Sequence, residues 1–62
     1  MWTVIYIAPN KSKAERMEQK LSEEGFMVKI RPSSLSKYQY EILVPEGELE
    51  DMEDIINSIL NS

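Results

Sequence analysis

The sequence Trp2-Thr3-Val4-Ile5-Tyr6-Ile7 consists entirely of β-branched and aromatic residues. These residue types favour a β-strand, so a strand is predicted at 2–7. Both of its faces are largely apolar, which predicts a strand covered on one face and partly shielded on the other. Pro9 follows closely and ends the strand, because proline has no N–H to donate to a ladder.

An amphipathic helix is predicted next, at residues 12–24. Ser12 and Glu15 have the spacing of a capping box, and Asn10 is an alternative N-cap. Gly25 stands where a left-handed residue would end the helix. Apolar residues recur at spacings of three and four and form one stripe: Ala14, Met17 and Leu21.

Two further strands and a second helix complete the chain. Apolar and polar residues alternate over 26–31 and again over 38–44, and the polar loop 32–37 separates them. A helical stripe of apolar residues then runs through 48–60. The first half of this helix is acidic, as the positive end of a helix dipole favours, and no Lys or Arg occurs from position 45 onward.

The expected order is therefore β-α-β-β-α in a single domain, 1–62, of the α+β class. A right-handed crossover places the first helix on one face of the sheet, and the second helix shares that face in a two-layer sandwich. This topology is a ferredoxin-like fold truncated before its last strand, with a three-stranded antiparallel sheet in the order 1-3-2. The missing strand leaves a free edge along 2–7, which carries no charged residue, proline or glycine.

Turns and element ends of this chain resemble those of a known bacterial family. The residues that carry the resemblance are Ile7-Ala8-Pro9-Asn10, Ala14-Glu15, Glu24-Gly25-Phe26 and Ile42-Leu43-Val44-Pro45-Glu46. Together they resemble the prokaryotic signal-transducing family of small β-α-β-β-α domains, which is likened to the PII regulators. The resemblance implies a role in signal transduction, and its motifs bring no catalytic or ligand-binding residue.

Composition narrows the classes of function. The chain has 62 residues, no Cys, no His and a net charge of −4. Disulfides and the usual zinc, haem and iron–sulfur sites are therefore excluded, and no metal or cofactor is expected. Short sequences of this kind are also labelled glutamate decarboxylase, but neither the large enclosed site nor the phosphate cradle of a pyridoxal phosphate enzyme is visible. No nucleophile motif occurs, so an enzyme is not expected.

The same features indicate where the protein acts. The apolar runs are much shorter than the roughly 20 residues that a membrane span needs, so no membrane contact is expected. The first residues lack the basic start of a signal peptide, which predicts a cytoplasmic protein. The negative net charge disfavours nucleic acid as a partner.

The free edge of the first strand is the principal candidate site. Adding a strand there would use main-chain hydrogen bonds, which we expect from Thr3 and Ile5, and alternate side chains for selectivity. The partner is either another protein or a second copy of the chain in a homodimer, and the expected function is a small regulatory or protein-interaction module. The predicted contact residues are Trp2, Thr3, Val4, Ile5 and Tyr6, together with an exposed Met27.

Three alternatives remain open at the sequence level. A small-metabolite or anion sensor would bind near Asn10 and Lys11, at the start of the first helix. An RNA-binding sheet face would use Tyr38 and Tyr40 as stacking platforms. The acidic run 46–54 is a solvated helix face, a contact for a basic partner or a divalent-cation site.

Overall fold

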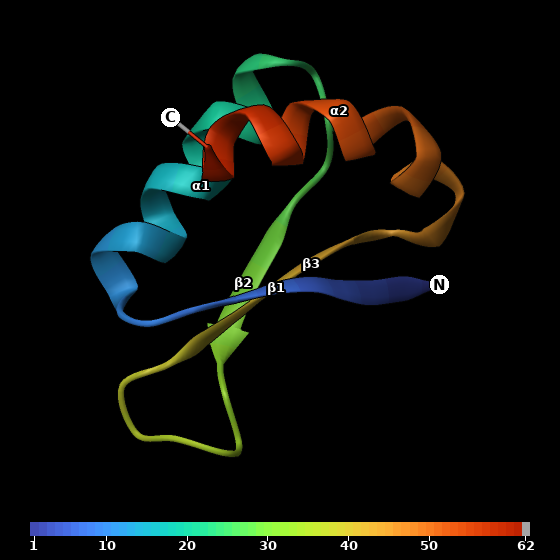
Figure 1. The fold of residues 1–62 in the computed structure, drawn as a ribbon. Helices are drawn as coiled ribbons and strands as arrows, with labels where there is room; N and C mark the ends of the chain where they lie inside the picture. The colour runs from blue at the N-terminus through green and yellow to red at the C-terminus, as the bar shows by residue number, and fades with distance from the viewer. Residues whose placement is uncertain (62) are drawn as a thin grey trace.

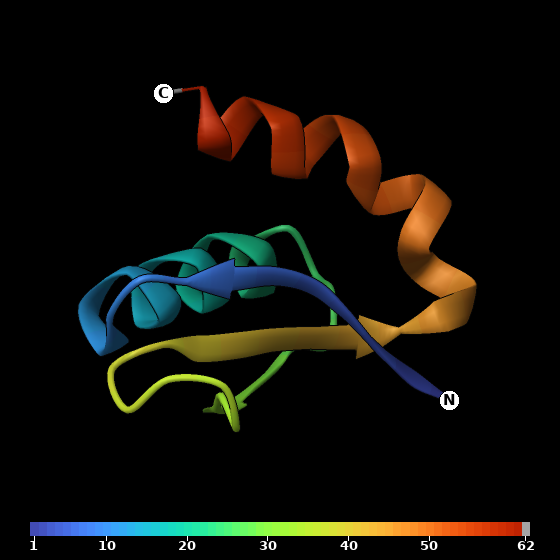
Figure 2. The ribbon, with the colours of Figure 1, turned by 60° about the horizontal axis from the view of Figure 1, so that its bottom comes forward.

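The computed structural model describes residues 1–61 and contains three strands and two α-helices. The elements follow one another as β1 (Trp2–Ala8), α1 (Lys11–Glu23), β2 (Lys29–Pro32), β3 (Tyr40–Pro45), a 3-10 turn η1 (Glu46–Glu48) and α2 (Leu49–Leu60). The strands form one antiparallel sheet in the order β1-β3-β2. Both helices lie on one face of this sheet (Figure 1, Figure 2). The predicted α+β sandwich, truncated ferredoxin-like and with strand order 1-3-2, is confirmed.

Helix α1 begins one residue earlier than predicted because a different residue caps it. The Asn10 side chain accepts a hydrogen bond from the Lys13 backbone N–H at 2.9 Å, so Asn10 is the N-cap and Ser12 lies inside the helix. The expected capping box of Ser12 and Glu15 is therefore wrong, and the alternative cap is right.

The other end of α1 has the expected glycine termination. Gly25 adopts φ 94°, and its N–H donates to the Ser22 carbonyl at 3.0 Å. The next N–H, that of Phe26, reaches back to the Leu21 carbonyl at 3.2 Å. These two bonds form a Schellman motif, which satisfies carbonyls that the end of the helix leaves free.

The strands differ from the prediction mainly at their ends. β2 starts at Lys29 rather than 26, because Phe26 and Val28 belong to an extended connection that packs against the core. β3 starts at Tyr40 rather than 38, and Tyr38 lies in the preceding loop. Both strands also run one residue further than predicted, and β1 extends to Ala8.

A β-bulge in β1 decides which of its side chains face the helices. Val4 lies opposite Leu43 and Tyr6 lies opposite Ile42, so Ile5 is the extra residue. Neighbouring side chains across a sheet share a face, and Ile42 is fully buried on the helix side. Tyr6 and Ile5 therefore pack toward the helices, while Val4 lies on the outer face.

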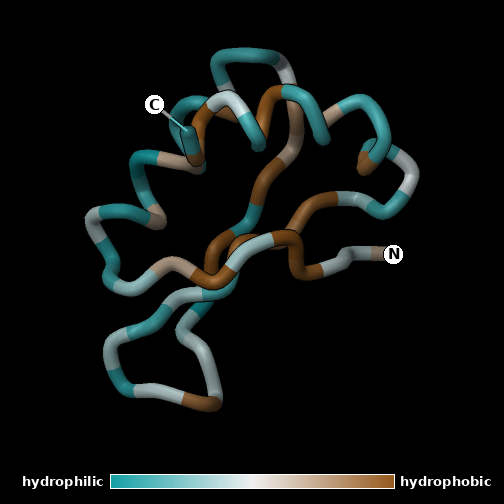
Figure 3. The backbone as a smooth tube through the Cα atoms, viewed as in Figure 1, coloured by the Kyte–Doolittle hydropathy of each residue, from teal (hydrophilic) through white to brown (hydrophobic). Residues whose placement is uncertain are grey.

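The core lies between the helices and the helix-facing side of the sheet. Its largest fully buried side chains come from α1, β3 and α2: Leu21, Ile42, Val44 and Met52. Met17 of α1 is also buried, as expected for a methionine on a helical apolar stripe. Figure 3 shows hydrophobic stretches along the strands and at intervals along α2, whereas most of α1 is hydrophilic. Helix α1 thus contributes one narrow buried stripe and presents the rest of its surface to solvent.

Candidate functional site

The strand β1 forms one edge of the sheet, and its outward backbone groups follow from the pairing with β3. The Met1 carbonyl accepts a hydrogen bond from the Glu46 N–H at 2.8 Å, so Met1 directs its carbonyl toward β3. Backbone groups of successive strand residues point to opposite sides. Thr3 therefore faces β3, whereas Trp2 and Val4 direct their N–H and C=O groups to the free edge. The expected main-chain bonds from Thr3 to a guest strand are thus wrong, because its backbone groups already face β3. Pro45, which lies opposite Trp2, has no N–H to offer, in agreement with this alternation.

Helix α2 stands above this edge and forms a groove with it. The groove has a volume of about 490 Å³. Two of its lining residues come from β1 and four from one side of α2: Val4, Ile5, Leu49, Glu53, Ile56 and Asn57. We call this set the edge groove. A fourth strand of a ferredoxin-like sheet would lie at this edge, beside β1 and beneath α2.

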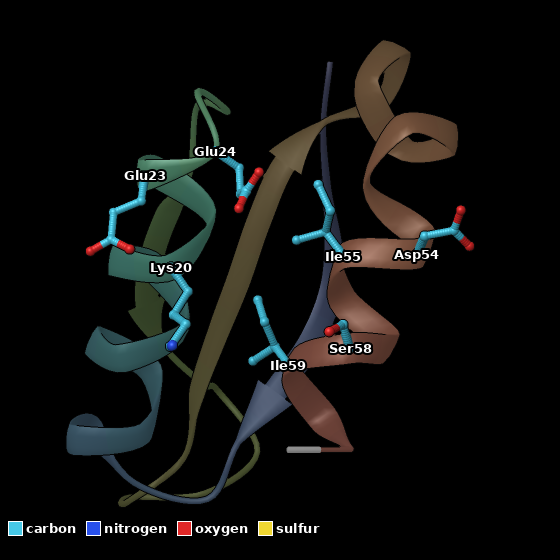
Figure 4. Close-up of a pocket in the computed structure, with 7 residues that line it drawn as sticks. All are labelled: Lys20, Glu23, Glu24, Asp54, Ile55, Ser58 and Ile59. Carbon is cyan, nitrogen blue, oxygen red and sulfur yellow. The ribbon is translucent and has the colours of Figure 1, made fainter.

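The edge groove exists because α2 has two apolar stripes. Ile55 and Ile59 point from α2 toward α1 in Figure 4, and the fully buried Met52 lies on the same stripe. Leu49 and Ile56 form a second stripe, which lines the groove. Of the first stripe only Met52 is fully buried, and Leu49 and Ile56 of the second are half-buried, as Ile55 and Ile59 are. Both stripes therefore keep some exposed apolar surface, and that of the second lies in the groove beside β1.

A second hollow lies between the two helices. Its volume is about 370 Å³, and charged side chains of both signs surround two isoleucines (Figure 4): Lys20, Glu23, Glu24, Asp54, Ile55, Ser58 and Ile59. No backbone edge opens into this hollow, because α1 and α2 satisfy their own main-chain bonds. It offers no site for strand pairing.

The outer face of the sheet, opposite the helices, combines apolar and charged side chains. The strand register places Val4, Leu43 and Lys29 in one row and Ile7, Glu41 and Arg31 in the next. Lys29 Nζ lies 4.3 Å from the centroid of the Trp2 ring, and Arg31 Nε donates to Glu41 Oε1 at 2.6 Å. The two cations of β2 are thus already engaged within their own sheet.

The structure brings only part of the predicted contact set together. Val4 and Ile5 line the edge groove, and Trp2 and Thr3 lie beside them on β1. Tyr6 packs against the core instead, because the bulge turns it toward the helices. Met27 is 61% exposed, as expected, but it lies next to β2, at the opposite edge of the sheet from β1.

Four residues of the groove were missed at the sequence level: Leu49, Glu53, Ile56 and Asn57. A signal for them was available. Helix α2 carries six apolar residues, Leu49, Met52, Ile55, Ile56, Ile59 and Leu60, which is more than one narrow stripe needs. The surplus indicates a second covered or partner-binding side.

The alternative sites are less well assembled. The Asn10 side chain is occupied as the N-cap of α1. Tyr38 is 70% exposed in a loop while Tyr40 packs against the core, so the expected shared face of the two tyrosines is wrong. Within residues 1–61, no group of three or more acidic side chains is placed to hold a metal ion. Over the same range, no helix is long and apolar enough to cross a membrane.

Comparison with family models, with curated proteins and with solved structures gives no match to this chain. The resemblance to the prokaryotic signal-transducing family therefore stays a prediction. Any account of function must rest on the geometry of the chain itself.

Proposed function

We propose that the protein is a small interaction module that binds an extended segment of a partner at the free edge of β1. The observation that carries this proposal is the edge groove, where outward backbone groups of β1 adjoin an apolar stripe of α2. Main-chain hydrogen bonds from Trp2 and Val4 would supply affinity, and the stripe of Leu49 and Ile56 would select the side chains of the guest.

The fold explains why this edge suits a guest strand. A bare strand edge is a template for pairing, and proteins usually blunt it with charges, proline or a covering element. Residues Trp2 to Ala8 include no charge and no proline. The bulge at Ile5 is the one blunting feature, and it leaves Trp2 to Val4 as a short regular stretch directly beside the groove. A short stretch of pairing suits a reversible, regulatory contact.

A designed peptide of defined sequence tests this function. In an extended conformation, the neutral peptide acetyl-Ser-Val-Thr-Gln-Thr-Val-Ser-amide has its two valines and the glutamine on one face and its serines and threonines on the other. We expect its titration to shift the amide resonances of Val4, Ile5 and Ile56. The variant Val4→Pro removes an outward N–H and should abolish these shifts, whereas Val4→Ala keeps the N–H and should preserve them. Unchanged groove resonances at millimolar peptide would refute strand addition.

A further inference from the structure

We infer that the edge groove selects a heterologous segment with one lysine or arginine flanked by apolar residues, the cation lying against Glu53. This inference rests on the proposed function and names the chemistry of the partner. Glu53 is the only charged residue among the six that line the groove. Helix α2 and the turn before it contain no Lys or Arg, so no cation of this element balances Glu53.

The rest of the described chain leaves Glu53 without a partner as well. Within residues 1–61 a single ion pair occurs, between Arg31 and Glu41 on the outer face. A carboxylate flanked by apolar side chains is a favourable place for a guest cation, because a strand that covers the groove excludes water from the pair. The same guest needs apolar side chains to cover Leu49 and Ile56.

The spacing of the groove residues fits a short strand. Leu49 and Ile56 are seven residues apart on a helix that rises about 1.5 Å per residue, so they lie roughly 10 Å apart along its axis. Same-face residues of a strand recur about every 6.7 Å. The groove therefore covers two to three side chains on the helix-facing side of the guest. A guest whose three successive helix-facing residues are apolar, cationic and apolar would place them opposite Leu49, Glu53 and Ile56, respectively.

A second copy of this chain is a poorer guest than a basic segment. The strand β1 carries no charged side chain that could form an ion pair with Glu53. In a symmetric pairing of two β1 strands, the two α2 helices, each with four carboxylates, would lie on the same side of the joined sheet. The strand β2 does carry Lys29 and Arg31, but both are engaged on the outer face, away from the helices.

The test compares peptides that differ in one central residue. The probes are acetyl-Ser-Val-Thr-Lys-Thr-Val-Ser-amide and its versions with Gln or Glu in place of Lys, titrated against the whole chain. We expect the Lys peptide to bind about two- to fivefold more tightly than the Gln peptide, as for a partly exposed ion pair, and the Glu peptide to bind most weakly. The variant Glu53→Lys should reverse this order. The matched control Glu50→Lys changes an exposed carboxylate outside the groove and should preserve it.

The outcomes separate this inference from the proposed function. Equal binding of all three peptides, with shifts at Val4 and Ile56, would overturn the cationic guest and leave strand addition intact. A reversal of order by Glu50→Lys as well would also overturn it, because the effect would then come from the net charge alone. If no peptide shifts the groove resonances, strand addition itself fails. Concentration-dependent dimers with protected β1 amides would identify a second copy as the occupant and overturn the heterologous guest.

Discussion

Two proline substitutions in β1 distinguish the backbone N–H groups that bond to β3 from those that point to the free edge. Thr3 pairs with Val44 and directs its N–H toward β3, whereas the Val4 N–H points to the free edge. Proline removes the N–H in both cases. In Thr3→Pro the N–H that is removed is one that bonds to β3, so the carbonyl of the fully buried Val44 is left without its donor. In Val4→Pro no ladder bond is lost, and proline is tolerated at an edge whose N–H faces solvent.

The size of the expected difference follows from these contacts. An unsatisfied buried carbonyl costs about 1–3 kcal/mol, and a lost ladder bond is included in that range. Val4 is already 40% exposed and a proline ring replaces most of its volume, so its substitution should cost less than about 1 kcal/mol. A chain of 62 residues is expected to have a free energy of unfolding of about 3–9 kcal/mol. Thr3→Pro therefore removes a large part of the stability, and Val4→Pro removes little of it.

Urea unfolding followed by far-ultraviolet circular dichroism measures both variants. With a slope of about 1–3 kcal/mol per molar urea, Thr3→Pro should lower the midpoint by roughly 1 M. Val4→Pro should unfold close to the parent. If Val4→Pro is destabilised as much as Thr3→Pro, the alternation derived for β1 is wrong, and the free edge does not present Trp2 and Val4.

Four further substitutions test the cap of α1, the docking of α2 and a contact on the outer face of the sheet. Asn10→Ala should lower the free energy of unfolding by about 0.5–2 kcal/mol through loss of the N-cap, whereas Ser12→Ala should have little effect. Equal losses of stability in thermal melts of the two variants would contradict Asn10 as the cap and support the capping box of Ser12 and Glu15. Met52→Ala should cost about 2–5 kcal/mol in urea unfolding because Met52 is fully buried, and a negligible loss would mean that α2 does not dock through it. Lys29→Met should cost about 0.5–1 kcal/mol and change the fluorescence of Trp2, and an unaltered spectrum would contradict their contact.

The topology was predictable because several local signals agreed. The β-branched run of β1, the apolar stripe of α1 and the prolines that end the strands each specify one element. The crossover rule then fixes where the first helix lies. The choice between Asn10 and Ser12 was harder, because both residue types cap helices and only the path of the backbone distinguishes them.

The bulge and the groove were beyond the sequence patterns. Val4, Ile5 and Tyr6 all favour strands, and nothing in their order marks which of them is the extra residue. The bulge nevertheless moves Tyr6 into the core and places Ile5 beside α2. The groove also depends on how far α2 extends past the sheet edge, which follows from tertiary packing rather than from the period of its apolar residues.

Amide hydrogen exchange at Val4, with Thr3 as an internal reference, tests the central claim most directly. In the free protein at low concentration, the Thr3 amide should be protected by its pairing with β3 and the Val4 amide should exchange rapidly. Saturation with the Lys-centred peptide should protect Val4 and leave Thr3 unchanged. Protection of Val4 in the free monomer, or rapid exchange of Val4 in the peptide complex, would contradict strand addition at this edge.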